Sequence, residues 1–402
     1  MNNRFKASAI AWGFVGALFL AAGASAQNGP GVTDSEIKLG QTMAYSGPVS
    51  AYGQYGKAEQ AYFRMINEQG GVNGRKINLI SLDDGYSPPK TVEQVRRLVE
   101  REGVLALFQN LGTASNMAIQ RYVDAQKIPN LFVISGDSKW ADAEAYPYST
   151  SWQPSNQTEA RVYARHILET RPQARIAVLY QNDDYGKDAL KGFKEELGDQ
   201  AGLIIAEASY EVSDPTVDSQ IVSFKGKGAD VFLNISTQKF AAQAIRKAYD
   251  IGWRPEHYLN SLAASVGAVL QPAGLEKSIG LVSVAYLKDP ADPRWADDPA
   301  MKDYLDFMKT YMPGDNIHDS MNVFGYSAAQ TMVHVLEQCG DDLSRENLMH
   351  QATNIKDLVL PMVLPGIVIN TTPTNRTALR AMQLARFDGT AWALFGDVIR
   401  PQ

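Results

Sequence analysis

Residues 37–84 read IKLGQTMAYSGPVSAYGQYGKAEQAYFRMINEQGGVNGRKINLISLDD, and this stretch decides the fold. It begins with a strand-like run and passes through a loop rich in Gly, Ser and Tyr. A helical pattern follows, and it stops at Gly70 and Gly71. A second strand-like run occupies 76–84. A strand, a helix and a second strand in this order predict two parallel strands joined by a right-handed crossover.

The loop at 43–56 is not a phosphate-binding loop. Its glycines, Gly47, Gly53 and Gly56, fit neither the dinucleotide fingerprint nor the P-loop pattern, and it contains no Lys before Lys57. The loop offers hydroxyl groups and tyrosine rings instead. We therefore expect a ligand other than a nucleotide.

The strand–helix alternation runs to about Trp152 and then restarts, which predicts two α/β units. From about Gly280 the pattern is less regular. We expect helices, one more strand and a final pair of strands in this part, which would complete both units. The expected segments are helices at 301–311, 320–338 and 345–353, and strands at 366–370, 378–387 and 391–399.

The first 26 residues read as a secretory signal peptide. Arg4 and Lys6 form a positive region, residues 7–22 are apolar, and ASA at 24–26 is a cleavage site before Gln27. The apolar run is shorter than the roughly 20 residues that span a bilayer. No Cys follows it, so a lipid anchor is not expected, and no later stretch is apolar enough to cross a membrane.

Charge and cysteine content narrow the class of protein. Without the signal, 36 Lys and Arg face 44 Asp and Glu, a net charge of −8. An acidic exported protein is a poor nucleic-acid binder. Cys339 is the single cysteine, so no intramolecular disulfide can form, and its surroundings predict a buried helical residue.

Motifs for catalysis or metal binding are missing from the sequence. The five histidines lack the close spacing of a zinc site, and no G-x-S-x-G or Cys–His signature occurs. We therefore expect no catalytic residue, metal or cofactor. The carboxylate pairs at 83–84 and 183–184 follow predicted strands and are interpreted as helix caps rather than as an acid–base pair.

Six loops share one chemistry just after predicted strands. Each carries small residues, hydroxyls or aromatic rings: AYSGPVSAYG, QNLGTASN, VISGDSKW, NDDYGK, NISTQ and NSLAAS. Small residues at helix N-termini expose backbone N–H groups, which favours an anion such as a carboxylate. Aromatic rings supply flat apolar walls with a polar tip. Because the loops come from both α/β units, they predict a ligand cleft between the units.

These motifs resemble one family. The opening stretch, KIPNLFVISGDSKW at 127–140 and ARIAVLYQNDDYGKD at 174–188 are similar to the leucine/isoleucine/valine-binding protein family, the periplasmic solute receptors of ABC importers with the type I fold. SGDSKW and WQPSNQTEARVYA also resemble the branch that receives aromatic acids. The resemblance implies an α/β fold of two doubly wound parallel-sheet lobes joined by three crossover strands. It divides the chain into the signal at 1–26, a first lobe of 33–152 plus 284–362, and a second lobe of 153–283 plus 363–402.

The resemblance also implies site residues. Tyr52 matches an aromatic residue that packs on the ligand, and Thr113 matches the hydroxyl residue that holds its carboxylate. Gly136 matches the backbone carbonyl that binds the ligand ammonium, and Ser138 a hydroxyl that binds the carboxylate. Tyr185 matches the tyrosine of the second lobe that closes over the ligand.

Two further positions depart from the amino-acid receptors. Ser236 falls near a position where those receptors carry another aromatic residue. Leu262 lies where they carry an acid that pairs with the ligand ammonium, and 257–275 contains no Asp or Glu. A buried ammonium without a partner is costly, which favours an aromatic acid over leucine. Asp137 is an alternative partner, or it caps a helix or points into solvent.

The sequence thus predicts a periplasmic receptor for a small carboxylate, such as a benzoate or hydroxycinnamate. The expected partner is an inner-membrane ABC permease, with no nucleic acid, no direct membrane insertion and no chemistry. Two lobes would close over the ligand by a hinge motion. Three alternatives stay open: a branched-chain amino acid receptor of the same kind of system, a periplasmic sensor module, and a secreted α/β enzyme.

Overall fold

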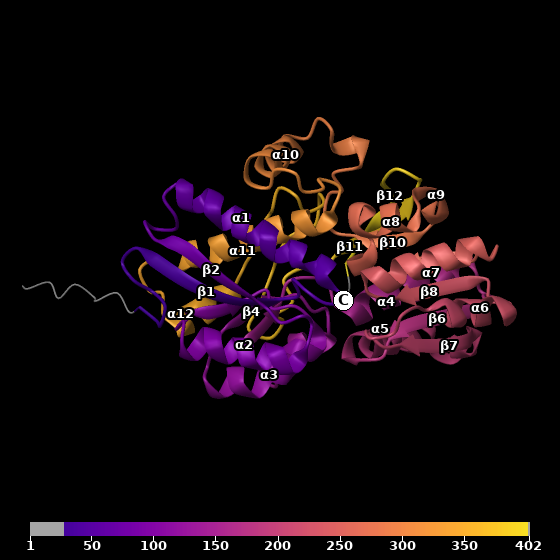
Figure 1. The fold of residues 1–402 in the computed structure, drawn as a ribbon, viewed down its shortest axis with the longest axis horizontal. Coiled ribbons are helices and arrows are strands. Elements are labelled where there is room, and N and C mark those ends of the chain that lie inside the picture. Colours follow the sequence, from indigo (N-terminus) through magenta and orange to yellow (C-terminus); the bar gives the residue numbers. More distant parts are fainter. Residues whose placement is uncertain (1–27, 401–402) are drawn as a thin grey trace, which may run out of the picture.

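The computed structural model describes residues 28–400 and contains two α/β lobes set side by side (Figure 1). Each lobe is built on its own mainly parallel sheet. The predicted signal peptide lies outside the described residues. The α/β prediction with two doubly wound sheets is confirmed.

The first lobe has a five-stranded parallel sheet in the order β2-β1-β3-β4-β5. Helices α1 and α11 cover one face and pack against each other, while α2 and α3 cover the other. The central strands are apolar and buried because both faces are covered. The bounds are β1 Glu36–Met43, α1 Gly53–Glu68, β2 Lys76–Asp83, α2 Pro88–Glu100, β3 Ala106–Phe108, α3 Thr113–Ala125, β4 Asn130–Val133, β5 Ser149–Ser151, α10 Pro299–Tyr311, α11 Ser320–Cys339 and α12 Arg345–Ala352.

The second lobe has a seven-stranded sheet in the order β12-β11-β10-β9-β8-β6-β7. Five strands are parallel, and β11 and β12 form an antiparallel pair at one edge. The predicted pairing of the last two strands is therefore confirmed. The bounds are α4 Asn156–Thr170, β6 Ile176–Gln181, α5 Asp184–Leu197, β7 Ile204–Tyr210, α6 Asp218–Gly226, β8 Val231–Ile235, α7 Gln238–Asp250, β9 Glu256–Leu259, α8 Gln271–Ala273, α9 Leu275–Ser278, β10 Val282–Ala285, β11 Met382–Phe387 and β12 Trp392–Ile399.

The chain crosses between the lobes three times: after β5, after β10 and before β11. The crossings lie side by side. Ala378 N–H donates to the Ser151 carbonyl at 2.9 Å, and Leu364 N–H donates to the Tyr286 carbonyl at 3.0 Å. The rings of Trp152 and Tyr286 meet with centroids 6.5 Å apart. These bonds gather the three crossings into one hinge.

The segment before β11 differs from the expected lobe division. Buried side chains between Val363 and Leu379 belong to the apolar core of the first lobe. The chain therefore joins the second lobe only near residue 380, rather than at 363. The strand expected at 366–370 is reduced to an isolated bridge between Leu358 and Ile369. A short apolar run that has no partner strand beside it packs as irregular chain. The periodicity of such a run does not distinguish it from a strand.

Helix α11 is the central helix of the first lobe. Gly325 lets it approach α1 closely, because a Cβ there would lie 2.7 Å from the Tyr55 carbonyl oxygen. Cys339 at the end of this helix is buried, as predicted. The interface between α1 and α11 thus fixes the elements that carry one wall of the cleft.

Candidate ligand-binding site

The carboxyl ends of the parallel strands of both sheets are directed toward the cleft between the lobes. In the first sheet β1 and β3 are neighbours whose connections leave to opposite sides, and in the second sheet β6 and β8 do the same. Ligands of open α/β sheets bind at such points. Helices α3 and α5 begin there, so their N-termini line the cleft.

The N-terminus of α3 is arranged to bind an anion. Gly112 precedes it with φ 96°, and a Cβ there would lie 2.7 Å from the Tyr86 ring, so only glycine fits. The hydroxyls of Thr113 and Ser135 are 2.7 Å apart, and Ser135 Oγ accepts from Trp140 Nε1 at 2.8 Å. The first N–H groups of a helix have no carbonyl partner within it. Together with the helix dipole they favour negative charge at this point.

A small cavity lies against this helix end, and we name it the α3 cavity. It encloses about 30 Å³, room for about two water molecules. The cleft is therefore closed around it. Its lining comes from both lobes: Tyr52, Tyr86, Leu111, Gly112, Thr113, Ile134, Ser135, Gly136, Tyr185, Thr237 and Leu262.

Tyrosine hydroxyls provide the polar tips in the α3 cavity. Tyr185 is 6% exposed, and its hydroxyl has no hydrogen-bond partner within residues 28–400. Burial raises the pKa of Tyr185 well above its ordinary value, with the nearby Tyr52 hydroxyl adding to the shift. The group therefore stays protonated and can donate. A buried donor without a partner is unfavourable unless a ligand supplies an acceptor.

Five of the predicted site residues line the α3 cavity together: Tyr52, Thr113, Gly136, Tyr185 and Leu262. The structure brings them together from five different loops, each of which follows a strand. What each does to a ligand stays a prediction.

Ser138 and Ser236 have other surroundings. Ser138 Oγ donates to Asp188 Oδ1 at 2.7 Å, and its N–H donates to Asp188 Oδ2 at 3.1 Å. Because Asp188 lies on α5, Ser138 joins the two lobes. Ser236 is fully buried and donates its hydroxyl to Asn234. Neither side chain lines the α3 cavity.

Sequence reasoning missed Tyr86, Ser135 and Thr237 in this cavity. Each lies in or beside a stretch already singled out after a strand: SLDDGY, VISGDSKW and NISTQ. The sequence shows that these residues follow predicted strands, but it does not show that their side chains face the cleft. The signal that would have found them is the shared location of the loops at one edge of each sheet.

The carboxylate pairs after the strands are structural. Asp183 caps α5 by accepting from Gly186 N–H at 3.2 Å. Asp83 accepts from the N–H groups of Tyr45 and Ser46 at 2.9 and 3.1 Å, which holds the loop before α1. The capping interpretation is therefore confirmed for Asp183, while Asp83 organises a loop instead.

An acid does lie beside Leu262, but it comes from α4. Glu159 accepts from Ser261 N–H at 2.7 Å, from Ser261 Oγ at 2.6 Å and from the Tyr163 hydroxyl at 2.9 Å. Burial raises its pKa, and these hydrogen bonds oppose the shift. Glu159 and Leu262 line a second cavity of about 10 Å³ that also touches Tyr185.

Asp137 lies away from Leu262 and caps a turn. Its Oδ1 accepts from Lys139 N–H at 3.0 Å and caps a short 3₁₀ turn. Burial, with Asp188 nearby, raises its pKa to about 6. It lines none of the cavities that Leu262 lines. Of the alternatives considered for Asp137, the helix-cap interpretation agrees with these contacts.

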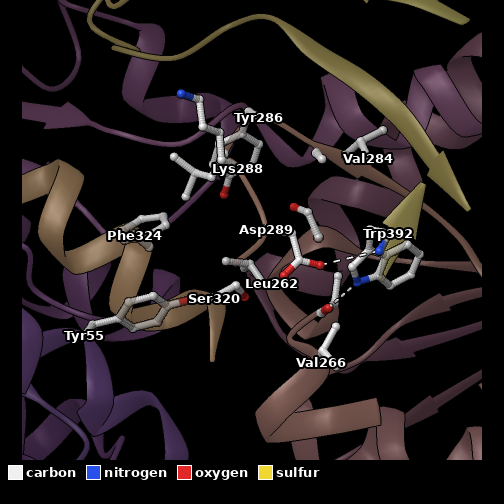
Figure 2. Close-up of a pocket in the computed structure, with 14 residues that line it drawn as sticks. Tyr55, Leu262, Val266, Val284, Tyr286, Lys288, Asp289, Ser320, Phe324 and Trp392 are labelled. Atoms are coloured by element: carbon white, nitrogen blue, oxygen red, sulfur yellow. Dashed lines mark hydrogen bonds between the residues drawn. The ribbon is translucent and has the colours of Figure 1, made fainter. Parts of the chain in front are cut away.

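A third cavity meets the others at Leu262 and lies beside the crossings, and we name it the hinge cavity (Figure 2). It encloses about 80 Å³. Its lining again comes from both lobes: Tyr55, Ser261, Leu262, Ala264, Val266, Val284, Ala285, Tyr286, Leu287, Lys288, Asp289, Ser320, Phe324 and Trp392.

Polar contacts close the cleft on two sides. Lys139 Nζ pairs with Asp184 on α5 at 3.1 Å, next to the Ser138–Asp188 bonds. On the other side Ser265 Oγ donates to Asp319 at 2.9 Å. The structure is therefore a closed arrangement of the two lobes.

Two further features bear on the kind of site. Within residues 28–400, no group of three or more His, Cys, Asp and Glu side chains is placed to hold a metal ion. Across the same residues, none of the helices has the length and apolar character that a membrane crossing requires.

Comparisons with known proteins agree with this geometry. A family model described as periplasmic binding protein matches residues 36–391. The Leu/Ile/Val-binding protein homolog 7 of Brucella abortus is 23% identical over 327 residues, which cover 78% of this chain and 80% of that protein.

Solved structures show the same fold at low sequence identity. A branched-chain amino acid ABC transporter protein from Thermus thermophilus with bound valine superposes with a TM-score of 0.82 at 16% identity, covering 92% of this chain and 98% of that one. An ABC transporter solute-binding protein from R. palustris in complex with 4-hydroxybenzoate gives 0.77 at 16% identity, covering 92% and 98%. The likenesses establish the type I periplasmic binding protein fold.

Proposed function

The chain belongs to the periplasmic binding protein family, whose members bind solutes and are not enzymes, and from that premise we propose that it receives a small aromatic carboxylate for an ABC importer. The proposed ligand is a benzoate or a hydroxycinnamate. An inner-membrane permease is the proposed partner.

One observation carries the proposal. The α3 cavity combines a helix N-terminus, the hydroxyl pair of Thr113 and Ser135, and the unpartnered hydroxyl of Tyr185. All are donors suited to a carboxylate. Among the described residues that line this cavity there is no Asp or Glu.

The walls favour an aromatic body. The rings of Tyr52 and Tyr86 border the α3 cavity, and those of Tyr55, Phe324 and Trp392 border the hinge cavity. Flat apolar walls suit a flat apolar ring. The R. palustris protein with bound 4-hydroxybenzoate shows that this fold is compatible with such a ligand.

A branched-chain amino acid is the second candidate, because Glu159 lies beside Leu262 and the T. thermophilus protein holds valine. Glu159 already accepts three hydrogen bonds from Ser261 and Tyr163. A carboxylate offers about four lone-pair sites, so little capacity is left for an ammonium group. An ammonium without a partner would cost at least ~1–3 kcal/mol, or about 5- to 150-fold in affinity.

The mechanism is closure. An open form binds the carboxylate on the first lobe at α3, and the second lobe then brings Tyr185 and Leu262 over it. The Ser138–Asp188 bonds form only when the lobes meet. Closure removes water from the ligand and gives a permease a shape that differs from that of the empty protein.

Titration calorimetry tests the ligand class. The protein is unfolded and refolded to remove any retained ligand, then titrated with benzoate, 4-hydroxycinnamate, leucine and valine. We expect the aromatic acids to bind at least 5-fold more tightly than either amino acid. Tight leucine binding with no response to aromatic acids would refute the proposal and direct attention to Glu159.

Export and transport have their own tests. The mature protein should begin at Gln27 and appear in an osmotic-shock fraction. Retention of Met1 on a cytoplasmic protein would contradict the receptor role. Permease genes next to this one would favour transport over a sensor, and a ligand recovered chemically unchanged after incubation excludes a secreted enzyme.

A further inference from the structure

We propose that the hinge cavity is a second chamber of the binding site, in which Asp289 recognises a hydroxyl group at the end of the ligand opposite its carboxylate. This inference deepens the proposed function and rests on it. It narrows the ligand class from aromatic acids in general to acids with a distal hydroxyl, as in 4-hydroxycinnamate.

The sizes of the cavities give the first argument. The α3 cavity, about 30 Å³, holds little more than a carboxylate. The larger free space, about 80 Å³, lies on the far side of Leu262. A ring-bearing ligand anchored at α3 must therefore extend past Leu262.

Leu262 is the junction of the site. It lines the α3 cavity, the hinge cavity and the small cavity beside Glu159. Its side chain is partly exposed and packs at the edge of the core of the second lobe rather than inside it. A change of its rotamer joins the cavities at the cost of a few apolar contacts.

The hinge cavity is built to hold a ring. Tyr55 and Phe324 meet with centroids 4.7 Å apart at the first lobe's side. Trp392 forms the opposite wall, and it is fixed because its Nε1 donates to the Ala264 carbonyl at 2.7 Å. Figure 2 shows these side chains on either side of Asp289. A flat apolar group fits between rigid aromatic walls.

Asp289 supplies the polar end. Its Oδ1 accepts from Ala291 N–H at 2.9 Å, and its Oδ2 accepts from Trp392 N–H at 3.4 Å. Within the described residues it forms no ion pair, because the neighbouring Lys288 turns away to Asp298 at 2.5 Å. The carboxylate retains acceptor sites toward the cavity. Burial raises its pKa, which a donor from a ligand would offset.

The two ends of the site therefore differ in the sign of the charge that they present to a ligand. The α3 end presents donors and the positive end of a helix dipole, whereas the hinge end presents a carboxylate. A ligand carboxylate at the hinge end would face Asp289 and be repelled. A hydroxyl there would donate to it. The ligand orientation is fixed by this difference.

The test compares three ligands that differ at one position: cinnamate, 4-hydroxycinnamate and 4-methoxycinnamate. 4-Methoxycinnamate carries a substituent at the position of the hydroxyl group, but this substituent has no O–H to donate. With the refolded full chain we expect 4-hydroxycinnamate to bind about 10-fold more tightly than the other two, because hydrogen bonds to charged groups are among the stronger ones.

Asp289→Asn is the decisive variant, because the amide keeps the size of the side chain and removes its charge. We expect it to shrink the 10-fold gap to about 3-fold or less. Asp297→Asn is the matched control. Asp297 is fully exposed and pairs with Lys302 at 3.6 Å outside the cavity, so its variant should keep the gap.

The outcomes separate the inference from the function on which it rests. Equal binding of cinnamate and 4-hydroxycinnamate, or a gap that Asp289→Asn leaves unchanged, overturns the second chamber and leaves the receptor for aromatic acids standing. Failure of all three acids to bind overturns both. Should Asp289→Asn not fold, as judged by circular dichroism, the three-ligand series on the unmodified chain still decides.

Discussion

The two ends of the site are built differently. At the α3 end, the helix N-terminus and the hydroxyls of Thr113 and Ser135 come from two short loops, at 112–113 and 135–136, which follow strands of the same sheet. The hinge cavity is assembled from five separate parts of the chain that include α1, α11, the second crossing and β12. One end is local and belongs mainly to one lobe, while the other exists only when both lobes and the C-terminal hairpin are in place.

This difference determines how each end responds to change. The first N–H groups of α3 and the hydroxyls of Thr113 and Ser135 belong to the first lobe, so they do not depend on closure, whereas the Tyr185 hydroxyl does. The hinge cavity depends on closure, because Tyr55 and Phe324 come from one lobe and Leu262 and Trp392 from the other. We infer that the α3 end provides affinity for the carboxylate and that the hinge end selects among carboxylates.

The strongest test of the α3 end is Thr113→Asp. It places a second anion beside the ligand carboxylate. Two like charges 4 Å apart repel by about 4 kcal/mol at an effective dielectric constant of about 20, which corresponds to about 1,000-fold in affinity. We expect calorimetry to detect no binding of any aromatic acid.

The matched control for this variant is Ser219→Asp, which adds the same charge to the first turn of α6 at an exposed position. It should leave affinity unchanged. Binding by Thr113→Asp at a strength close to that of the unmodified chain would place the ligand carboxylate elsewhere.

Leu262→Glu tests the junction between the two ends. A carboxylate there lies next to the α3 cavity and the hinge cavity, so aromatic acids should bind 10- to 100-fold more weakly. Leu262→Met, which conserves volume, should cost at most about 10-fold. Loss of the aromatic acid without any gain of leucine would show that position 262 lines the site but does not alone set ligand class.

Asp188→Asn tests closure without touching either end. Ser138 donates to Asp188 across the closed cleft, and Gln157 donates to the same carboxylate from within the second lobe. We expect about 5-fold weaker binding of every aromatic acid alike, with a larger radius of gyration of the ligand-saturated protein in small-angle scattering.

Asp184→Asn serves as the control for closure, because its pair with Lys139 is half exposed and such pairs contribute little. It should change affinity by less than about 3-fold. Should Asp188→Asn weaken one acid and spare another, Asp188 would act on the ligand and not on closure.

The smallest effect on binding is expected at Glu59, in the core of the first lobe. Its carboxylate is fully buried, and within residues 28–400 it forms no ion pair. Burial raises its pKa well above the ordinary 4.5. The folded chain holds this proton more tightly than the unfolded chain, so the free energy of unfolding decreases as pH rises above 4.5 toward the folded-state pKa.

Glu59→Gln removes this dependence. We expect Tm to rise by about 2–4 °C at pH 8 and to change little at pH 4, while affinity for aromatic acids stays within 2-fold. Thermal unfolding at pH 4 and pH 8 measures this change in Tm. A lower Tm at pH 8 would mean that the Gln41 hydrogen bond requires the carboxylate.

The contrast between the two ends also explains what the sequence predicted. Strand–helix alternation fixes the two lobes, and the position after each strand brings Thr113, Gly136 and Tyr185 to the cleft. The hinge cavity was not predicted, because Tyr55, Phe324 and Trp392 sit in ordinary amphipathic elements whose direction depends on tertiary packing. No local pattern marks such residues.

Two other differences have the same origin. The residues 260–275 that follow β9 contain no acid, whereas Glu159 reaches the site from α4, 102 residues before Ser261. The segment at 363–379 lacks a regular period, so the sequence does not show that it packs in the first lobe. Residues that are close in space but distant in sequence can be identified only from the folded structure.

A crystal structure of the chain with 4-hydroxycinnamate tests the central claim most directly, because it shows which end of the ligand meets which end of the site. We predict carboxylate oxygens within about 3.2 Å of Thr113 Oγ1 and the first N–H groups of α3, and the ring beyond Leu262. A reversed ligand, with its carboxylate in the hinge cavity and its ring at α3, would contradict the account.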